Sequence, residues 1–410
     1  MPAVSRSRLI WRWSFAIVLC CASGAAFAQQ KSSRQVVMTA GASPTAPYSP
    51  AVKAGDLIYL SGTLATDEKG NVSGDIQAQT KRVLDNLGVV LKAAGVGFAD
   101  VVSTQVYLKN PADVQPMNAI YRARWPKDPP ARTTVVVEEF VRPNALIEIN
   151  MIAARSGVSH KAILPAGWAA PSEPFSYAVK AGDTLFVSGL LPRNGKDNSV
   201  VAGDVKVQTK AVMDNIAAVL KAADMDFPDV AGGRIWVTDS KTFQDMNSVY
   251  RTYYQKDLPA RATLKGRFEN AQDLVQISMV AVKGAARQPV AGAPAADGTA
   301  GRPNPNYSAG LAAGGRMYIT GMTGSTPDNA GDMKAQTREA LARMSRTLKA
   351  GGFETSDVVE VNVYLSDASK FEAMNEGYRE TFAKDLPART TVQAAGVGSA
   401  LVEIVMTAAR

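Results

Sequence analysis

The sequence predicts an α+β fold in which one domain occurs three times. Each copy contains M-N-x-x-Y followed by K-D-x-P-A-R, and the arginine lies 14 positions after the asparagine every time. A second shared run, a strand-like stretch that ends in S-G or T-G, begins at Tyr48, Phe175 and Tyr307, so equivalent positions lie 127 and 132 residues apart. This period is far above the roughly 20–50 residues of solenoid repeats. Each copy is therefore long enough to have its own hydrophobic core.

The hydrophobic pattern of the first copy predicts its elements in order. Residues 57–62 follow the turn dipeptide Gly55-Asp56 and predict a strand. Residues 76–94 have an apolar stripe at helical spacing that ends at Gly95, and they predict a helix. A strand over 101–108, a helix over 112–124 and strands over 133–138 and 145–153 follow. Because strands and helices intermix, each copy should be one sheet with two helices on one face.

Composition shifts divide the chain into domains and linkers. We expect domains over 36–155, 175–284 and 305–410, joined by linkers over 156–174 and 285–304. The first linker is proline-rich and contains His160, the only histidine, which we interpret as a linker residue. The second is rich in alanine, glycine and proline and should be mobile.

The first 28 residues are typical of a secretory signal peptide. Three arginines precede a short apolar stretch, and Ala26-Phe27-Ala28 follows it. The apolar stretch is shorter than the roughly 20 residues of a spanning helix, which disfavours a retained anchor. We therefore expect a periplasmic or secreted protein with no membrane association after cleavage. Both cysteines, Cys20 and Cys21, lie in this segment, so the mature chain would contain none.

This composition excludes several kinds of chemistry. A chain without cysteine has no disulfides, thiol nucleophiles or thiolate metal sites. A single histidine leaves no material for a Ser-His-Asp triad or a histidine-based zinc site, so we expect neither metal nor cofactor. The formal charge is +8, of which three arginines of the leader contribute three, leaving +5. The basic residues form no stripe of the kind that nucleic-acid binders show, so no nucleic-acid partner is expected.

One glutamate lies in a strand that is apolar on both faces. Glu403 and its equivalent Glu148 are carboxylates in strands that look buried, where a charge is costly unless it is paired or neutralised. A structural ion pair with a nearby arginine is the alternative to catalysis. The second copy favours function because it keeps the strand but has Gln276 there, and a fold-critical ion pair would less readily lose its charge.

The repeated arginines follow Pro-Ala at the start of a strand. A guanidinium held by a rigid turn suits two parallel hydrogen bonds to a planar carboxylate, although an arginine that caps the preceding helix remains an equal alternative. The repeated asparagines, and the serine or threonine before the glycine, add small polar groups. Each of these, taken alone, is more typical of a turn or a cap.

Together these positions resemble the RidA family, also called YjgF or the L-PSP endoribonuclease family. Five motifs follow one another in the same order in the three copies, in full in the first and with single replacements in the others: the P-Y-S-x-A-V-x-x-G opening, the strand that ends in S-G, N-x-x-Y, P-A-R and the last strand with its glutamate. The resemblance implies chorismate-mutase-like domains and trimers with an active cleft between neighbouring subunits. It also implies hydrolysis of 2-imino acids to 2-oxo acids and ammonia, in which arginine binds the carboxylate and glutamate orients or activates water.

When the family's site residues are matched to each copy in turn, the resemblance implies that the copies contribute unequal sets of these residues. The first copy has every group, at Tyr48, Ser61, Asn118, Arg132 and Glu148. The second has Ser188, Asn247 and Arg261 but Phe175 and Gln276, and the third has Tyr307, Thr320, Asn375, Arg389 and Glu403. A cysteine common in the family is replaced by Thr134, Thr263 and Thr391. The catalytic residues would be Arg132, Glu148, Arg389 and Glu403, and the remaining polar groups would bind substrate.

The sequence thus predicts an exported single-chain pseudo-trimer, monomeric in solution, that acts on small 2-imino or 2-oxo acids. At most two clefts should be competent, because an amide such as Gln276 cannot exchange a proton with water. A small-carboxylate-binding or protein-interaction module without turnover is the alternative. An endoribonuclease is disfavoured, because the domains lack histidine and an aromatic-basic strip.

Overall fold

The computed structural model describes residues 1–2, 34–43 and 45–410. The predicted signal peptide over 1–28 therefore lies outside the described residues, except for its first two. The chain divides into Met1–Lys31 and Ser32–Arg410, and the second unit contains all three copies. Within the described ranges, no helix combines the length and apolar composition needed to cross a bilayer.

The three copies have the same succession of elements. The first copy contains β1 (Gln35–Val37), β2 (Ala51–Ala54), β3 (Leu57–Leu64), α1 (Ile76–Ala93), β4 (Val101–Leu108), α2 (Val114–Arg122), β5 (Ala131–Val136), β6 (Glu139–Phe140) and β7 (Ile147–Ala154). The second contains β8 (His160–Ile163), β9 (Ala178–Ala181), β10 (Thr184–Leu190), α3 (Val205–Ala222), β11 (Val230–Val237), α4 (Phe243–Tyr250), β12 (Ala260–Lys265) and β13 (Val275–Val282). The third contains β14 (Gln288–Val290), β15 (Gly310–Ala313), β16 (Arg316–Thr323), α5 (Met333–Ala350), β17 (Val358–Leu365), α6 (Phe371–Thr381), β18 (Ala388–Gln393) and β19 (Val402–Ala409).

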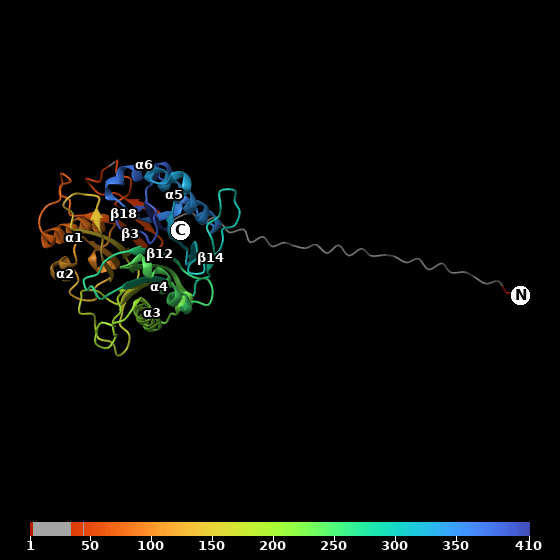
Figure 1. Ribbon diagram of the computed structural model, residues 1–410, viewed down its shortest axis with the longest axis horizontal. Helices are drawn as coiled ribbons and strands as arrows, with labels where there is room; N and C mark the ends of the chain where they lie inside the picture. The colour runs from red at the N-terminus through yellow and green to blue at the C-terminus, as the bar shows by residue number, and fades with distance from the viewer. Residues whose placement is uncertain (3–33, 44) are drawn as a thin grey trace. The chain divides into compact units, whose positions relative to one another are not determined.

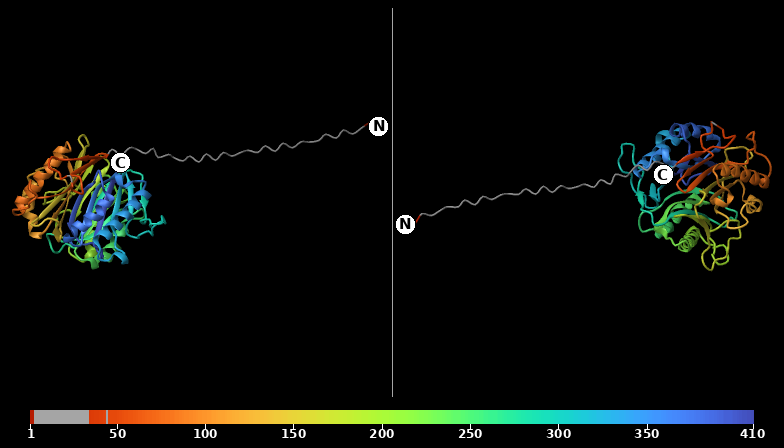
Figure 2. Two further views of the ribbon diagram at one scale, coloured as in Figure 1. Left: turned by 90° about the horizontal axis from the view of Figure 1, so that it is seen from above. Right: turned by 180° about the vertical axis from the view of Figure 1, so that it is seen from behind.

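Each copy builds a mixed sheet, which confirms the predicted α+β class. The strand orders are β1-β2-β3-β7-β4-β5, β12-β11-β13-β10-β9-β8 and β14-β15-β16-β19-β17-β18-β6. Strands pair antiparallel except for β4 with β5, β11 with β12 and β17 with β18, which are parallel because a helix connects them. Figure 1 shows the helices of each copy on the outer side of its sheet, and the turned views of Figure 2 agree.

The long helix of each copy covers its sheet with one apolar face. In α1 the buried side chains include Val83, Leu87 and Leu91, which follow helical spacing. Asp75 caps the first turn by accepting a hydrogen bond from the Ala78 N–H at 2.9 Å, and Gly95 follows the last turn with a φ of 77°. The helix therefore begins and ends close to where the sequence predicts, and it packs against β3, β7 and α2.

The opposite face of each sheet packs against the other copies. One buried cluster joins Leu57 and Tyr59 of the first copy to Phe186 of the second and Ala388 of the third. Strand β5 contacts β10, β12 contacts β16, and β18 contacts β3, so every copy contacts both of the others. The final strands are apolar on both faces because one face contacts the copy's own helices and the other contacts neighbouring copies.

The predicted linkers contain short edge strands. His160 begins β8, which pairs with β9, so the structure differs from its interpretation as a linker residue. Likewise β14 pairs with β15 inside the segment expected to be mobile. Edge strands of three or four residues are ordered by backbone hydrogen bonds to a neighbouring strand. Because these two segments have no hydrophobic alternation, their sequences do not predict a strand. The second helix also starts later than predicted, at Val114, after a 3-10 turn over Pro111–Asp113.

Candidate active sites between the copies

A β-bulge shapes the S-G or T-G motif of every copy. The register of β3 against β7 shifts between Leu60 and Thr63, at Ser61 and Gly62. The same shift occurs in β10 at Ser188 and Gly189, and in β16 at Thr320 and Gly321. Bulges redirect side chains, and these three turn a hydroxyl toward the neighbouring copy.

The hydroxyl of the motif fixes the arginine of another copy through its backbone. Ser61 Oγ accepts a hydrogen bond from the Arg389 N–H at 2.8 Å and donates one to the Ser49 carbonyl at 2.6 Å. Ser188 makes the same two bonds, to the Arg132 N–H at 2.8 Å and the Ser176 carbonyl at 2.6 Å.

Thr320 Oγ1 donates to the Arg261 carbonyl and so fixes the third arginine. These hydroxyls were predicted to bind substrate. In the structure each hydroxyl positions an arginine of a neighbouring copy through its backbone, and a contact with substrate stays a prediction.

Each guanidinium lies buried between two aromatic rings. Arg389 lies 4.6 Å from the ring centroid of Tyr378 in its own copy and 5.7 Å from that of Tyr48 in the first copy. Arg261 and Arg132 have the same arrangement, with Tyr250 and Tyr307 and with Tyr121 and Phe175, respectively. Burial lowers the pKa of all three guanidiniums. The stacked rings stabilise the charge and fix the plane of the guanidinium.

The two glutamates are buried carboxyl groups that face these arginines. Burial raises the pKa of Glu148 to about 8, although the Thr391 backbone N–H and the Arg389 charge act in the opposite direction. Burial raises the pKa of Glu403 to about 8 as well, against the charge of Arg261. Carboxyl groups with a pKa this close to neutral pH can both donate and accept a proton.

The glycine of the motif makes room for the carboxyl group. A Cβ on Gly62 would overlap Glu148 Oε1, and one on Gly321 would overlap Glu403 Oε1. At Gly189 a Cβ would lie 2.8 Å from Gln276 Cδ. Glycine is therefore required at these positions because a larger residue would overlap a neighbouring side chain, and not because the backbone has a positive φ.

In the structure, the predicted residues of one copy do not form one site together, as they would in a grouping by copy. The arginine and asparagine of one copy meet the bulge, the aromatic ring and the glutamate of another. The first site comprises Asn118, Arg132, Phe175, Ser188 and Gln276; the second comprises Asn247, Arg261, Tyr307, Thr320 and Glu403; the third comprises Asn375, Arg389, Tyr48, Ser61 and Glu148. Arg132 therefore faces an amide and not Glu148, because each sheet presents its bulged strand to the arginine strand of a neighbour.

The third site is open. Tyr48, Gly62, Glu148, Asn375, Arg389 and Thr391 line a cavity of about 290 Å³. Among the described residues, Arg389 Nη1, Asn375 Oδ1 and Glu148 Oε2 are buried and have no hydrogen-bond partner. Buried polar atoms without partners are uncommon, so a small polar ligand would find both donors and acceptors here.

In the second site the guanidinium already has protein partners. Arg261 donates to Asn247 Oδ1 and Thr263 Oγ1, and its Nε donates to the Asn306 carbonyl at 3.4 Å. The guanidinium therefore has protein partners that a ligand carboxylate would displace. Glu403 remains close enough for its charge to act on Arg261.

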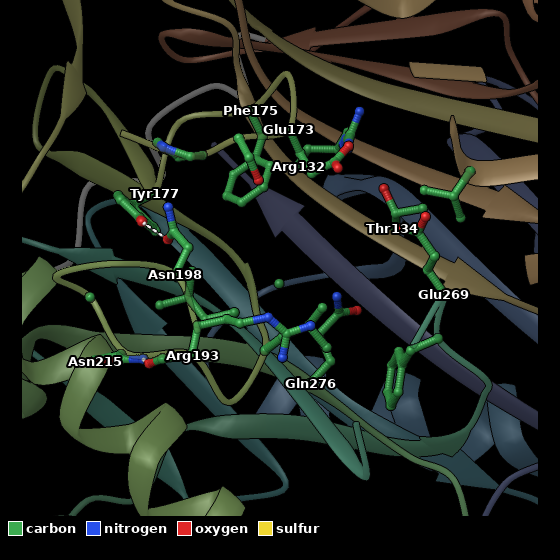
Figure 3. A pocket seen from close by; sticks show the side chains of 18 of the residues that line it. Arg132, Thr134, Glu173, Phe175, Tyr177, Arg193, Asn198, Asn215, Glu269 and Gln276 are labelled. Carbon is green, nitrogen blue, oxygen red and sulfur yellow. Dashed lines mark hydrogen bonds between the residues drawn. The ribbon is translucent and has the colours of Figure 1, made fainter. Parts of the chain in front are cut away.

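The first site lacks a carboxyl group at the position that Glu148 and Glu403 occupy in the other two sites. Figure 3 shows Arg132 and Phe175 on one side of its cavity and Gln276 and Arg193 on the other. Arg132 donates from Nη1 to Asn118 Oδ1 at 2.7 Å. The cavity measures about 200 Å³.

Sequence reasoning found the tyrosine of N-x-x-Y on the same helical face as the asparagine but gave it no role beneath the guanidinium. Tyr121, Tyr250 and Tyr378 belong to M-N-x-x-Y, and their spacing of three from the asparagine places both side chains on one helical face. That spacing was the available signal. In the part of the chain that is described, no cluster of histidine, cysteine, aspartate and glutamate suits a metal ion.

The fold and the sites define a class of protein. Its α+β domains pack so that one copy supplies the arginine of a site and another copy supplies the carboxyl group. The sequence profile of the family described as Endoribonuclease L-PSP matches residues 38–155, 168–283 and 299–410. The chain belongs to this family, which confirms the resemblance to RidA and YjgF.

Relatives are similar to single copies. A RutC family protein of Saccharolobus solfataricus is 43% identical over 126 residues, which is 30% of this chain and 99% of that protein. A protein of Acinetobacter baylyi named 3-aminoacrylate deaminase RutC is 38% identical over 123 residues, 29% of this chain and 97% of that protein. The solved YjgF gene product of E. coli is 32% identical, with a TM-score of 0.28 over 30% of this chain and 98% of that one.

Proposed function

We propose that the chain is a deaminase that hydrolyses small 2-imino acids to 2-oxo acids and ammonia at its second and third sites. The observation that supports this most is a buried carboxyl group with a pKa of about 8 in the same site as a stacked arginine. The name of the Acinetobacter baylyi relative, a deaminase of an unsaturated amino acid, supports the reaction type.

The residues of the third site suit each step of this hydrolysis. The Arg389 guanidinium binds the substrate carboxylate and holds the imine carbon next to Glu148. The Glu148 carboxylic acid donates its proton to the imine nitrogen. The resulting carboxylate then accepts a proton from the attacking water, and a C–O bond forms. Glu148, protonated again, donates to the amine nitrogen of this adduct as the C–N bond breaks, and it takes the hydroxyl proton as the C=O bond forms, so a 2-oxo acid and ammonia leave.

The first test is a deaminase assay of the mature protein on imines generated in situ from several amino acids. Because kcat/KM reports the pKa values of the free enzyme, it should fall about tenfold per pH unit above pH 8, where the glutamates lose their protons. Turnover on none of the imines, together with arginine-dependent binding of 2-oxo acids, would replace the deaminase with a small-carboxylate-binding module.

We also propose that the mature chain is a monomer whose copies act as an intramolecular pseudo-trimer. The contacts of every copy with both others support this, and covalent linkage raises the effective concentration of each partner. Light scattering should give the mass of one chain. A stable assembly of three chains would contradict the proposal, since each copy would then have to pair with copies of other chains.

Export is a further proposal, based on the signal-like composition of residues 1–28. Mass spectrometry of protein recovered from the cell envelope should find a chain that starts near Gln29. Protein recovered from the cytosol with Met1 in place would contradict export and would be consistent with a metabolic role inside the cell.

A further inference from the structure

The first site contains polar groups for a ligand but has Gln276 where the other two sites have a buried carboxyl group. Arg132 is 5% exposed, and its guanidinium faces the cavity together with Thr134 and Gln276. Thr134 Oγ1 and Gln276 Oε1 are buried and find no hydrogen-bond partner within residues 34–43 and 45–410. The cavity can therefore bind a carboxylate and a neighbouring polar group without acting on either.

Apolar side chains make up much of the wall of this cavity. Trp168, Phe175, Leu190 and Leu191 line it. Trp168 packs edge-on against the Tyr177 ring with centroids 5.0 Å apart, and the Tyr177 hydroxyl donates to Asn198 Oδ1 at 2.7 Å. These contacts fix an apolar wall. The volume of about 200 Å³ is below the roughly 300–1,000 Å³ of sites for drug-sized ligands and suits a single amino acid.

Two carboxylates lie at the rim of the same cavity. Gln115 Nε2 donates to Glu173 at 3.0 Å and to Glu269 at 2.8 Å, and Asn118 also donates to Glu173. Both carboxylates are close enough to act on the charge of Arg132. At the positions equivalent to Glu173 the other copies have Ala46 and Pro305, so no other copy has a carboxylate at this position. The third site has a rim carboxylate at a different position, Glu372, which accepts a hydrogen bond from Asn375 at 3.4 Å.

The second arginine of the cavity is already paired. Arg193 donates to both carboxylate oxygens of the fully buried Asp273, at 2.5 and 2.6 Å. Its charge is therefore balanced within the protein. The charges left for a ligand are the cation of Arg132 inside and the anions of Glu173 and Glu269 at the rim, of which Glu173 also accepts from Asn118 of the site.

We propose that the first site binds a free α-amino acid with a large apolar side chain and does not convert it. The carboxylate binds Arg132, the ammonium group binds Glu173, and the side chain packs against Trp168 and Leu190. A zwitterion matches this pair of opposite charges, whereas a 2-oxo acid brings no cation to Glu173, whose protein partners Gln115 and Asn118 are neutral amides. The inference goes beyond the proposed deaminase, because binding here involves no turnover.

Titration calorimetry on the full mature chain tests this with L-phenylalanine, and with phenylpyruvate as the probe that lacks the ammonium group. L-Phenylalanine should bind, and Glu173→Gln should weaken its binding roughly 10-fold or more, the scale of a lost hydrogen bond to a charged group. The same change should not weaken phenylpyruvate binding, because it removes a negative charge close to the carboxylate that Arg132 would hold. The matched control is Glu372→Gln, which removes an exposed carboxylate from the third site and should not change L-phenylalanine binding.

Two results would overturn the proposal. One is the absence of L-phenylalanine binding by protein whose melting temperature shows that it is folded. The other is binding that Glu173→Gln leaves unchanged and Arg389→Lys weakens, which would assign the amino acid to the third site. Because heat of binding is measured without turnover, neither result depends on whether the second and third sites are deaminases.

Discussion

Replacing Glu148 and Glu403 together with glutamine should lower the rate of imine hydrolysis roughly 100-fold or more, the usual scale for the loss of a general acid or base. The double variant makes the second and third sites resemble the first, which has Gln276. Glutamine keeps the shape and the hydrogen bonds of the buried carboxyl groups. The loss would therefore reflect proton transfer and not the packing around Gly62 and Gly321.

The controls for this variant separate chemistry from binding. Calorimetry with a 2-oxo acid should still detect binding through Arg261 and Arg389, the two guanidiniums that face the altered residues. Each single variant should keep the activity of the untouched site. A double variant with wild-type activity would show that neither glutamate takes part in the mechanism.

The sequence predicts the fold of one copy closely because the signals are local. The stripe of α1 and the alternation of β4 depend only on spacing within the element, and β4 occupies the predicted residues, Val101–Leu108. The edge strands β8 and β14 differ, because backbone pairing with a distant strand orders them and leaves no pattern in their side chains.

The candidate site was predictable in its residue types but not in their combination. The repeated arginine, asparagine and glutamate all lie at sites between copies. Repetition alone cannot tell which copy faces which, and the grouping of Arg132 with Glu148 followed chain order. The bond from Ser61 to the Arg389 backbone joins residues 328 positions apart, and only the packing of the sheets sets such a pairing.

Glu173 illustrates a second limit of sequence patterns. It lies in a segment expected to be a linker and has no counterpart in the other copies, so no repeated motif indicates it. Its position next to Asn118 depends on the path of that segment over the first site. Repeats reveal what the sites share, and the structure is needed to find where they differ.

Pairs of substitutions across the sites should distinguish the observed combination from a grouping by copy. In the structure Glu148 shares a site with Arg389, and Glu403 shares one with Arg261. Adding Arg389→Lys to Glu148→Gln should therefore change little, because both changes affect the third site. Adding Arg261→Lys to Glu148→Gln should reduce the remaining activity roughly 10- to 100-fold, because lysine cannot make two parallel hydrogen bonds to a carboxylate.

A grouping by copy predicts the opposite ranking of the residual deaminase activities of these two double variants. It places Glu403 with Arg389, so Glu148→Gln with Arg389→Lys would then be the inactive pair. Lysine retains the positive charge next to the tyrosine rings, so both variants should fold, and melting temperatures check this. Steady-state rates on one imine, compared with Glu148→Gln alone, decide between the two arrangements, since the substitutions are the same in kind and differ only in which site they share.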